Sequence, residues 1–372
     1  MRYYIIAGEA SGDLHGSNLI LALKERDKDT VIRCWGGDLM QCAGGELVRH
    51  YRDLAYMGFW EVLVHLRTIM RNLRSCERDL LAFQPDVLIL IDYPGFNLRM
   101  AKFARRHGIK VFYYISPQLW AWKSSRVKTI KECVSKMFVI LPFEPVFYNK
   151  FDHQVDFVGH PLLDVIHSNR DVDNRDIFLE RNNLPDKPII ALLPGSRKQE
   201  IRTMLRRMIE VIPSFMDYQF VIAGAPSISQ ELYHSIIKDR ELKIVTGQTY
   251  DLLGYSEAAL VTSGTATLET ALLGVPEVVC YKGSALSFWI ARRIVKVDYI
   301  SLVNLVMGRE VVKELVQNLL TRKNLIRELT LLFDPAIRTE MKKSYEELTE
   351  KLGGRGASAR TAELIVQYLT DN

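Results

Sequence analysis

The chain contains one stretch in which an apolar run, a glycine turn and a basic segment follow directly: Pro188-Ile189-Ile190-Ala191-Leu192-Leu193-Pro194-Gly195-Ser196-Arg197-Lys198. The apolar run is typical of a strand buried on both faces of a parallel sheet. Gly195 permits a tight turn, and the polar residues that follow predict the start of a helix. A helix N-terminus beside a guanidinium favours an anion such as a diphosphate, so Ser196 and Arg197 become candidate binding residues. The alternative is a capped helix with basic side chains on its surface.

Further short apolar runs alternate with longer amphipathic stretches on both sides of this segment. Because continuous apolar strands alternating with helices imply parallel sheets covered on both faces, we expect an α/β fold. Strands are predicted at residues 3–7, 86–91, 110–115 and 136–140, and then at 188–193, 219–222, 242–245, 258–261 and 277–280.

Two such series indicate two domains, since 372 residues exceed one ordinary core and suit units of roughly 150–200 residues. The polar segment 164–188 separates the series and is predicted to be a linker with a short helix. Two further helices are predicted at 335–352 and 358–369. Ligands of open parallel sheets bind outside the carboxyl ends of the strands, so we expect a ligand in a cleft between the two sheets.

The bulk composition excludes several classes of protein. With 48% apolar and 25% charged residues the chain is typical of a folded protein rather than a disordered one. A net charge of +5 favours anionic partners but is too small to indicate nucleic acid. Five scattered cysteines without a Cys-x-x-Cys motif predict reduced thiols. We see neither a secretory leader nor a membrane-spanning apolar run, and therefore expect a cytoplasmic protein that can still contact a membrane.

A second turn in the latter half also has ligand-binding character. It reads Thr262-Ser263-Gly264-Thr265-Ala266-Thr267-Leu268-Glu269 and follows a predicted strand. The N–H groups and hydroxyls of Ser263, Gly264 and Thr265 suit phosphate oxygens. Glu269 lies one helical turn beyond Thr265, on the same side, where it can accept hydrogen bonds from ribose hydroxyls.

The first half contributes two turns that carry carboxylates. Glu9 and Asp13 belong to a glycine-rich turn that follows the first strand, for which a plain strand-to-helix turn is the alternative. Asp92 ends an almost purely apolar strand, where partial desolvation can raise its pKa towards that of a general base. The alternative for Asp92 is a turn aspartate before Pro94-Gly95.

An aromatic loop follows the strand predicted at 110–115. The loop combines polar and aromatic side chains that can form a surface facing a sugar or a lipid. These are Ser116, Gln118, Trp120 and Trp122. The alternative is a core loop anchored by its tryptophans.

The segment 57–74 mixes apolar side chains with three arginines and predicts an amphipathic basic helix that can lie in the headgroup layer of a membrane. The alternative is a helix that packs its apolar face into the first domain. The predicted membrane contacts are Phe59, Trp60, Leu63, Leu66, Arg67, Met70 and Arg71.

Seven blocks of the sequence, in order, resemble the signature blocks of the bacterial lipid-A-disaccharide synthase family. They are Ala7–Asp13, Ser116–Trp122, Leu141–Glu144, Phe157–Pro161, Leu193–Arg197, Ser263–Glu269 and Tyr299–Leu305. The resemblance implies a GT-B architecture of two Rossmann-like domains, with an acceptor domain at 1–165, a donor domain at 166–340 and terminal helices at 341–372 that return to the first. It also implies β-1,6 transfer from UDP-2,3-diacylglucosamine to 2,3-diacylglucosamine 1-phosphate. The protein would then act as a peripheral protein on the inner face of the cytoplasmic membrane, and a homodimer is possible.

The family resemblance and the residues together suggest an inverting mechanism. Asp92 resembles the family's catalytic carboxylate and is expected to be the base, with Glu9 and Asp13 as alternatives. The donor half has no Asp-x-Asp motif at a strand end, so we expect no metal or other cofactor and assign the diphosphate charge to Arg197 and its neighbours. Glu269 and Asn304 are the further nucleotide contacts. The rival functions are an epimerase or soluble-acceptor transferase on the same fold, and a non-catalytic nucleotide- or lipid-binding module.

Overall fold

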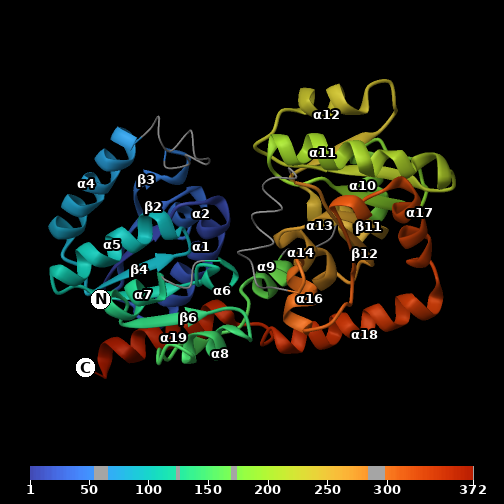
Figure 1. Ribbon diagram of the computed structural model, residues 1–372. Coiled ribbons are helices and arrows are strands. Elements are labelled where there is room, and N and C mark those ends of the chain that lie inside the picture. Colours follow the sequence, from blue (N-terminus) through green and yellow to red (C-terminus); the bar gives the residue numbers. More distant parts are fainter. Residues whose placement is uncertain (54–65, 123–125, 169–173, 284–297, 372) are drawn as a thin grey trace. The chain divides into compact units, whose positions relative to one another are not determined.

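A computed structural model describes the chain except for residues 54–65, 123–125, 169–173, 284–297 and 372 (Figure 1). The described residues form two compact units, the first made of Met1–Asp164 with Gly353–Asn372 and the second of Val165–Leu352. Helix α9 (Leu162–Ser168) runs across the boundary between them.

The first unit contains a seven-stranded parallel sheet in the order β3-β2-β1-β4-β5-β6-β7. Its strands are β1 (Arg2–Ala7), β2 (Val31–Gly36), β3 (Glu46–His50), β4 (Val87–Ile91), β5 (Lys110–Tyr114), β6 (Lys136–Val139) and β7 (Asp156–Phe157). Its helices are α1 (Ala10–Arg26), α2 (Asp38–Cys42), α4 (Leu66–Phe83), α5 (Pro94–Arg106), α6 (Leu119–Trp122), α7 (Val127–Cys133), α8 (Glu144–Asn149) and α19 (Ala357–Thr370), with a 3-10 turn η1 (Tyr51–Asp53).

The first sheet is covered on both faces because successive strand residues point to opposite sides. Tyr4 and Ile6 of β1 pack with apolar residues of α4, α5 and α7. Tyr3 and Ile5, which alternate with them, pack with apolar residues of α1 and α19. The C-terminal helix, red in Figure 1, therefore completes the core of the N-terminal unit.

The second unit contains a six-stranded parallel sheet in the order β10-β9-β8-β11-β12-β13. Its strands are β8 (Ile189–Leu193), β9 (Gln219–Gly224), β10 (Lys243–Thr246), β11 (Ser256–Thr262), β12 (Glu277–Tyr281) and β13 (Lys313–Val316). Its helices are α10 (Arg175–Arg181), α11 (Lys198–Met208), α12 (Gln230–Ile237), α13 (Thr249–Gly254), α14 (Thr265–Leu272), α16 (Leu302–Met307), α17 (Arg322–Leu331) and α18 (Pro335–Lys351), with 3-10 turns η3 (Ile209–Ser214) and η4 (Gln317–Leu319).

The two terminal helices belong to different units. The predicted boundary at residue 341 lies inside α18, which belongs to the second unit. Asp334 caps this helix by accepting hydrogen bonds from the N–H groups of Ala336 and Ile337, and Pro335 occupies its first turn. Helix α18 contacts α14 and α16 of the second unit, whereas α19 contacts α1. The chain therefore returns to the first unit at Gly353.

Candidate functional site

The two predicted anion-binding turns lie side by side at one edge of the second sheet. Strand β8 pairs with β11, and Leu193 lies opposite Val261 at their carboxyl ends. The chain continues from β8 to β9 on one side and from β11 to β12 on the other. This reversal is a topological switch point, the position at which open α/β sheets bind ligands.

The turn after β8 is shaped around the backbone of Gly195. Its φ of +101° is a conformation that side chains disfavour, and an added Cβ would lie 2.3 Å from a carboxylate oxygen of Glu200. That same oxygen accepts a hydrogen bond from the Ser196 N–H at 3.3 Å. An anion of the chain itself therefore lies at the start of α11, which shows that this helix start accepts negative charge.

Arg197 is the N-cap residue of α11 and its side chain is exposed. Among the residues that the structure describes, no carboxylate pairs with the Arg197 guanidinium. A cation without an internal partner beside a helix N-terminus is suited to an external anion.

The turn after β11 keeps its shape through Ser263. Its N–H donates to the Cys280 carbonyl at 3.0 Å, and its hydroxyl donates to the Ile300 carbonyl at 2.9 Å. Both donors of Ser263 are thus used inside the chain, and the groups left to face a ligand are the first N–H groups of α14 and the exposed Thr265 hydroxyl.

A cavity of about 200 Å³ joins the two turns. One of its lining residues is Thr262, whose buried hydroxyl has no hydrogen-bond partner among the described residues. The cavity is lined by Leu193, Gly195, Ser196, Glu200, Ala223, Gly224, Ala225, Pro226, Thr249, Thr262, Ser263, Gly264, Thr265 and Ala266.

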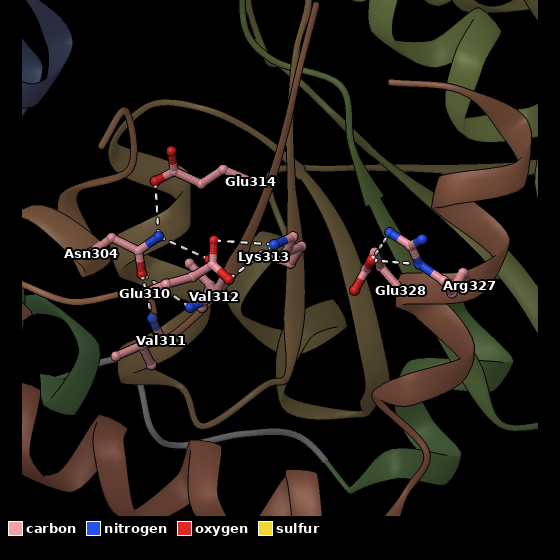
Figure 2. Close-up of polar contacts among 8 residues, drawn as sticks. All are labelled: Asn304, Glu310, Val311, Val312, Lys313, Glu314, Arg327 and Glu328. Carbon is pink, nitrogen blue, oxygen red and sulfur yellow. Dashed lines mark hydrogen bonds and ion pairs between the residues drawn. The ribbon is translucent and has the colours of Figure 1, made fainter. Parts of the chain in front are cut away.

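The other two predicted nucleotide contacts do not line this cavity. Glu269 accepts a hydrogen bond from the Tyr250 hydroxyl at 3.2 Å, and its burial raises its pKa. The side chain of Asn304 donates to Val312 and Glu314, and its oxygen accepts from the N–H groups of Val311 and Val312 (Figure 2). A nucleotide contact by Asn304 would therefore require one of these bonds to break.

The first sheet has its own switch point, between β1 and β4. These strands pair with Ala7 opposite Ile91, and the chain continues to opposite sides of the pair. The glycine-rich turn after β1 and Asp92 after β4 therefore lie at the same edge. Gly8 is required there because a Cβ at this position would lie 2.3 Å from the Tyr93 ring.

Asp92 is held in an unfavourable backbone conformation. Asp92 and Tyr93 have φ angles of 43° and 48°, in the left-handed region, which costs of order 1–3 kcal/mol per residue. The Asp92 carbonyl accepts from the Asn97 amide at 2.7 Å and from the Tyr113 hydroxyl at 2.5 Å. The buried Asn97 and Tyr113 side chains thus hold the backbone of Asp92 in this conformation.

The electrostatic surroundings bring the pKa of Asp92 closer to neutral pH. Burial raises its pKa from 3.8 to about 6, the nearby Glu9 carboxylate adds to the effect, and the Tyr93 N–H opposes it. Glu144 ends the signature block Leu141–Glu144 but is not among the predicted site residues. Burial raises its pKa to about 7, although it accepts hydrogen bonds from the N–H groups of Leu141 and Ile140 at 2.9 and 3.1 Å.

Asp13, the third predicted carboxylate, has a different environment. Its oxygens accept from the N–H groups of Gly37 at 2.7 Å, Met40 at 3.0 Å and Leu39 at 3.2 Å, which caps helix α2. Because its carboxylate is occupied by these N–H groups, Asp13 connects α1 to the start of α2. Glu9 is the N-cap residue of α1 and remains beside Asp92 as the alternative base.

We expect Asp13→Ala to lower the free energy of unfolding by about 2–3 kcal/mol, because buried N–H groups would lose a charged acceptor. Urea unfolding followed by circular dichroism measures this, with the exposed Asp29→Ala as the matched control. A variant of unchanged stability that has lost turnover would instead support a catalytic Asp13.

The aromatic loop has both a buried and an exposed side. The Ser116 hydroxyl is buried and shares a hydrogen bond with the Tyr148 hydroxyl at 2.7 Å. Trp120 is half-buried, with its ring 4.9 Å from that of Phe143, whereas Gln118 is exposed. The Trp122 side chain lies outside the described residues. The loop is thus anchored by Ser116 and presents Gln118 to solvent.

Helix α4 has an apolar face and a basic face. Leu73, Cys76 and Leu80 belong to the core of the first unit. Arg67, Met70 and Arg71 are exposed and line a surface groove with Arg74, Glu77 and Arg78. The predicted membrane contacts Phe59, Trp60 and Leu63 and the Leu66 side chain lie outside the described residues. None of the described helices is long and apolar enough to span a bilayer.

The described residues contain no group of three or more metal-ligating side chains. The polar groups at both switch points are hydroxyls, N–H groups, a guanidinium and carboxylates. They suit hydrogen bonding and proton transfer.

Comparisons with known proteins agree with this geometry. Residues 3–368 match the family described as Lipid-A-disaccharide synthetase. The Lipid-A-disaccharide synthase of Syntrophus aciditrophicus (strain SB) is 41% identical over 374 residues, which cover 98% of this chain and 97% of that protein.

Solved structures share the fold at low sequence identity. The UDP-GlcNAc 2-epimerase from Neisseria meningitidis, bound to UDP-GlcNAc, has a TM-score of 0.66 at 14% identity and covers 100% of both chains. The glycotransferase of kitacinnamycin has a TM-score of 0.65 at 15% identity, covering 99% of this chain and 99% of that one. The predicted fold class, two Rossmann-like parallel sheets of the GT-B type, is confirmed.

Proposed function

The chain belongs to the lipid-A-disaccharide synthase family, glycosyltransferases of lipid A biosynthesis, and on that premise we propose which substrates it joins and how. The donor is UDP-2,3-diacylglucosamine and the acceptor is 2,3-diacylglucosamine 1-phosphate. The products are the β-1,6-linked disaccharide 1-phosphate and UDP.

Asp92 acts as the general base of the reaction. It takes the proton from the 6-hydroxyl of the acceptor while that oxygen forms a bond to C1 of the donor sugar. The bond between C1 and the β-phosphate oxygen breaks, and UDP leaves with the electron pair. A pKa of about 6 supports this role, because the carboxylate is ionised at neutral pH yet basic enough to accept a proton.

The second unit binds and stabilises the departing UDP. Arg197, the N-terminus of α11 and the first N–H groups of α14 offer positive charge and hydrogen bonds to the diphosphate. No metal is required in this account. The observation that carries the proposal is the cavity that joins the two turns at the switch point of the second sheet.

A UDP-release assay with the two acylated glucosamines tests this function. We expect UDP to be released only when donor and acceptor are both present, at the same rate with and without a chelator. Loss of activity with the chelator would contradict the metal-free account. If the protein instead converts UDP-N-acetylglucosamine to an epimer and transfers no sugar, the result would favour the alternative that it is an epimerase. The epimerase from Neisseria meningitidis has a similar fold.

The basic face of α4 is proposed to contact the membrane that holds both lipid substrates. Exposed arginines attract anionic headgroups, and the exposed Met70 can enter the boundary between headgroups and acyl chains. Because the opposite face of the helix packs in the core, this contact does not require the first unit to unfold.

We expect the combined Met70→Ser and Arg71→Ala variant to bind more weakly to vesicles of phosphatidylethanolamine and phosphatidylglycerol. One arginine near an anionic surface contributes about 1 kcal/mol, so the partition coefficient should fall at least about fivefold. Vesicle sedimentation measures it, and Leu21→Ser with Lys28→Ala, exposed on the same unit, is the control. Equal loss in both variants would contradict a specific role for α4.

A further inference from the structure

Glu314 lies on β13, the edge strand of the second sheet, and its carboxylate holds a segment distant in sequence. One oxygen accepts from the Ser301 N–H and the Asn304 amide, both at 2.9 Å, and from the Ile300 N–H at 3.2 Å. The other oxygen accepts from the Ile300 N–H at 3.0 Å. A carboxylate that accepts several N–H groups fixes the backbone that carries them.

The same cluster fixes the start of α16. The Ser301 hydroxyl accepts from the Asn304 N–H at 3.2 Å, as an N-cap does. The Asn304 side chain spans the gap between Glu314 and the backbone of Val311 and Val312, as Figure 2 shows. Asn304 is fully buried, so its amide is a rigid brace for the Glu314 carboxylate.

The segment held by Glu314 reaches the turn after β11. The N–H of Ile300 donates to Glu314, and the carbonyl of Ile300 accepts the Ser263 hydroxyl at 2.9 Å. One residue thus connects the edge strand to the turn that lines the cavity.

We propose that Glu314 is a positioning residue of the donor site, which orients Ser263 and its turn through the backbone of Ile300 and Ser301. This inference rests on the proposed UDP-binding role of that turn. Glu314 does not itself touch the nucleotide. Its removal lets the segment 300–301 shift, the Ser263 hydroxyl loses its fixed acceptor, and the N–H groups at the start of α14 lose their alignment.

The test is UDP binding by Glu314→Gln, measured by calorimetry on the full chain. Gln replaces one of the two acceptor oxygens with a donor that opposes the Ile300 N–H, and we expect the Kd for UDP to rise about tenfold, equivalent to 1.4 kcal/mol. In steady-state assays the KM for the UDP donor should rise while the KM for the lipid acceptor stays unchanged. A merely structural defect would affect both substrates.

The matched control is Glu310→Gln, the same chemical change four positions earlier. Glu310 pairs with the half-exposed Lys313 at 3.0 Å (Figure 2), and its hydrogen bonds among the described residues go to Lys313 rather than to the segment 300–301. We expect its UDP affinity to equal that of the wild type. If Glu314→Gln does not fold, Glu314→Asp retains the charge but shortens the reach, and the same rise in Kd is expected.

A double-mutant cycle distinguishes positioning from an independent effect. If Glu314 acts through Ser263, then Ser263→Ala and Glu314→Gln together should weaken UDP binding no more than the stronger single change. Additive losses would overturn the inference, as would unchanged UDP affinity in folded Glu314→Gln. Absence of UDP binding by the wild type would instead refute the proposed function, so the two failures are distinguishable.

Discussion

Asp92→Asn is expected to lower kcat by about 10²–10⁴-fold, the usual contribution of a general base, while the Kd for UDP stays unchanged. The substitution keeps the size of the side chain and the backbone bonds that Asn97 and Tyr113 make to the Asp92 carbonyl. It removes only the group that accepts the proton. Since UDP is assigned to the second unit, its binding should not respond.

The pH dependence of the wild type gives this prediction a second measurement. The pKa of Asp92 is raised to about 6, mainly by burial. Below that pH the carboxyl group is protonated and cannot accept a proton, so kcat/KM should fall as the pH decreases through 6. An ordinary exposed aspartate would place this limb near pH 4. If kcat/KM of Asp92→Asn still falls near pH 6, the group that titrates there is a different one, such as Glu144.

Arg197→Ala is expected to lower kcat/KM by about 10²–10³-fold, because leaving-group charge would lose a preorganised cation. UDP itself should bind more weakly in calorimetry. Arg197→Lys should recover only part of the loss, because an ammonium group lacks the planar fork of a guanidinium. Fold stability should not change, since the side chain is exposed at the start of α11.

The control for Arg197 is Arg202→Ala, an exposed arginine farther along the same helix. Its removal changes the net charge equally but leaves the helix start intact. Equal effects of both variants would mean that only the general positive charge of α11 matters, and the specific role of Arg197 would then be wrong.

The central strands were predictable from sequence because burial on both faces demands a continuous apolar run. Ile189–Leu193 and Val87–Ile91 are fully buried and were both recognised. Strands β2 and β3 were missed. Arg33 of β2 interrupts the apolar pattern and pairs with Glu46 of β3 at 2.8 Å, and a partner on a neighbouring strand cannot be seen in a local window.

Strands β7 and β13 were missed for related reasons. β7 has two residues, and β13 contains Lys313 and Glu314 among its four residues. Such short or charged edge strands resemble loops in sequence, and only pairing with β6 and β12 defines them.

The two aspartates that follow strands of the first sheet show how far site residues can be predicted from the sequence. Asp13 and Asp92 both follow strands, and sequence position alone could not separate a helix-capping aspartate from one in a strained, buried turn. The distinction came from the N–H groups of Gly37 and Met40, which lie far from Asp13 in sequence. The sequence does not predict a role for the Glu144 and Glu314 carboxylates, because the backbone N–H groups that they bind carry no signal in the residue types. Glu200 could be predicted from the local sequence, because a glutamate three positions after the N-cap residue, here Arg197, commonly binds N–H groups at the helix start.

The most direct test of the account is a single-turnover experiment with enzyme in excess over UDP-2,3-diacylglucosamine, mixed with 2,3-diacylglucosamine 1-phosphate and analysed by mass spectrometry. It observes bond formation without product release. We expect the wild type to form the disaccharide 1-phosphate, and Asp92→Asn to bind the donor but form the product about 10²–10⁴-fold more slowly. Formation of the disaccharide by Asp92→Asn at the wild-type rate would contradict this expectation.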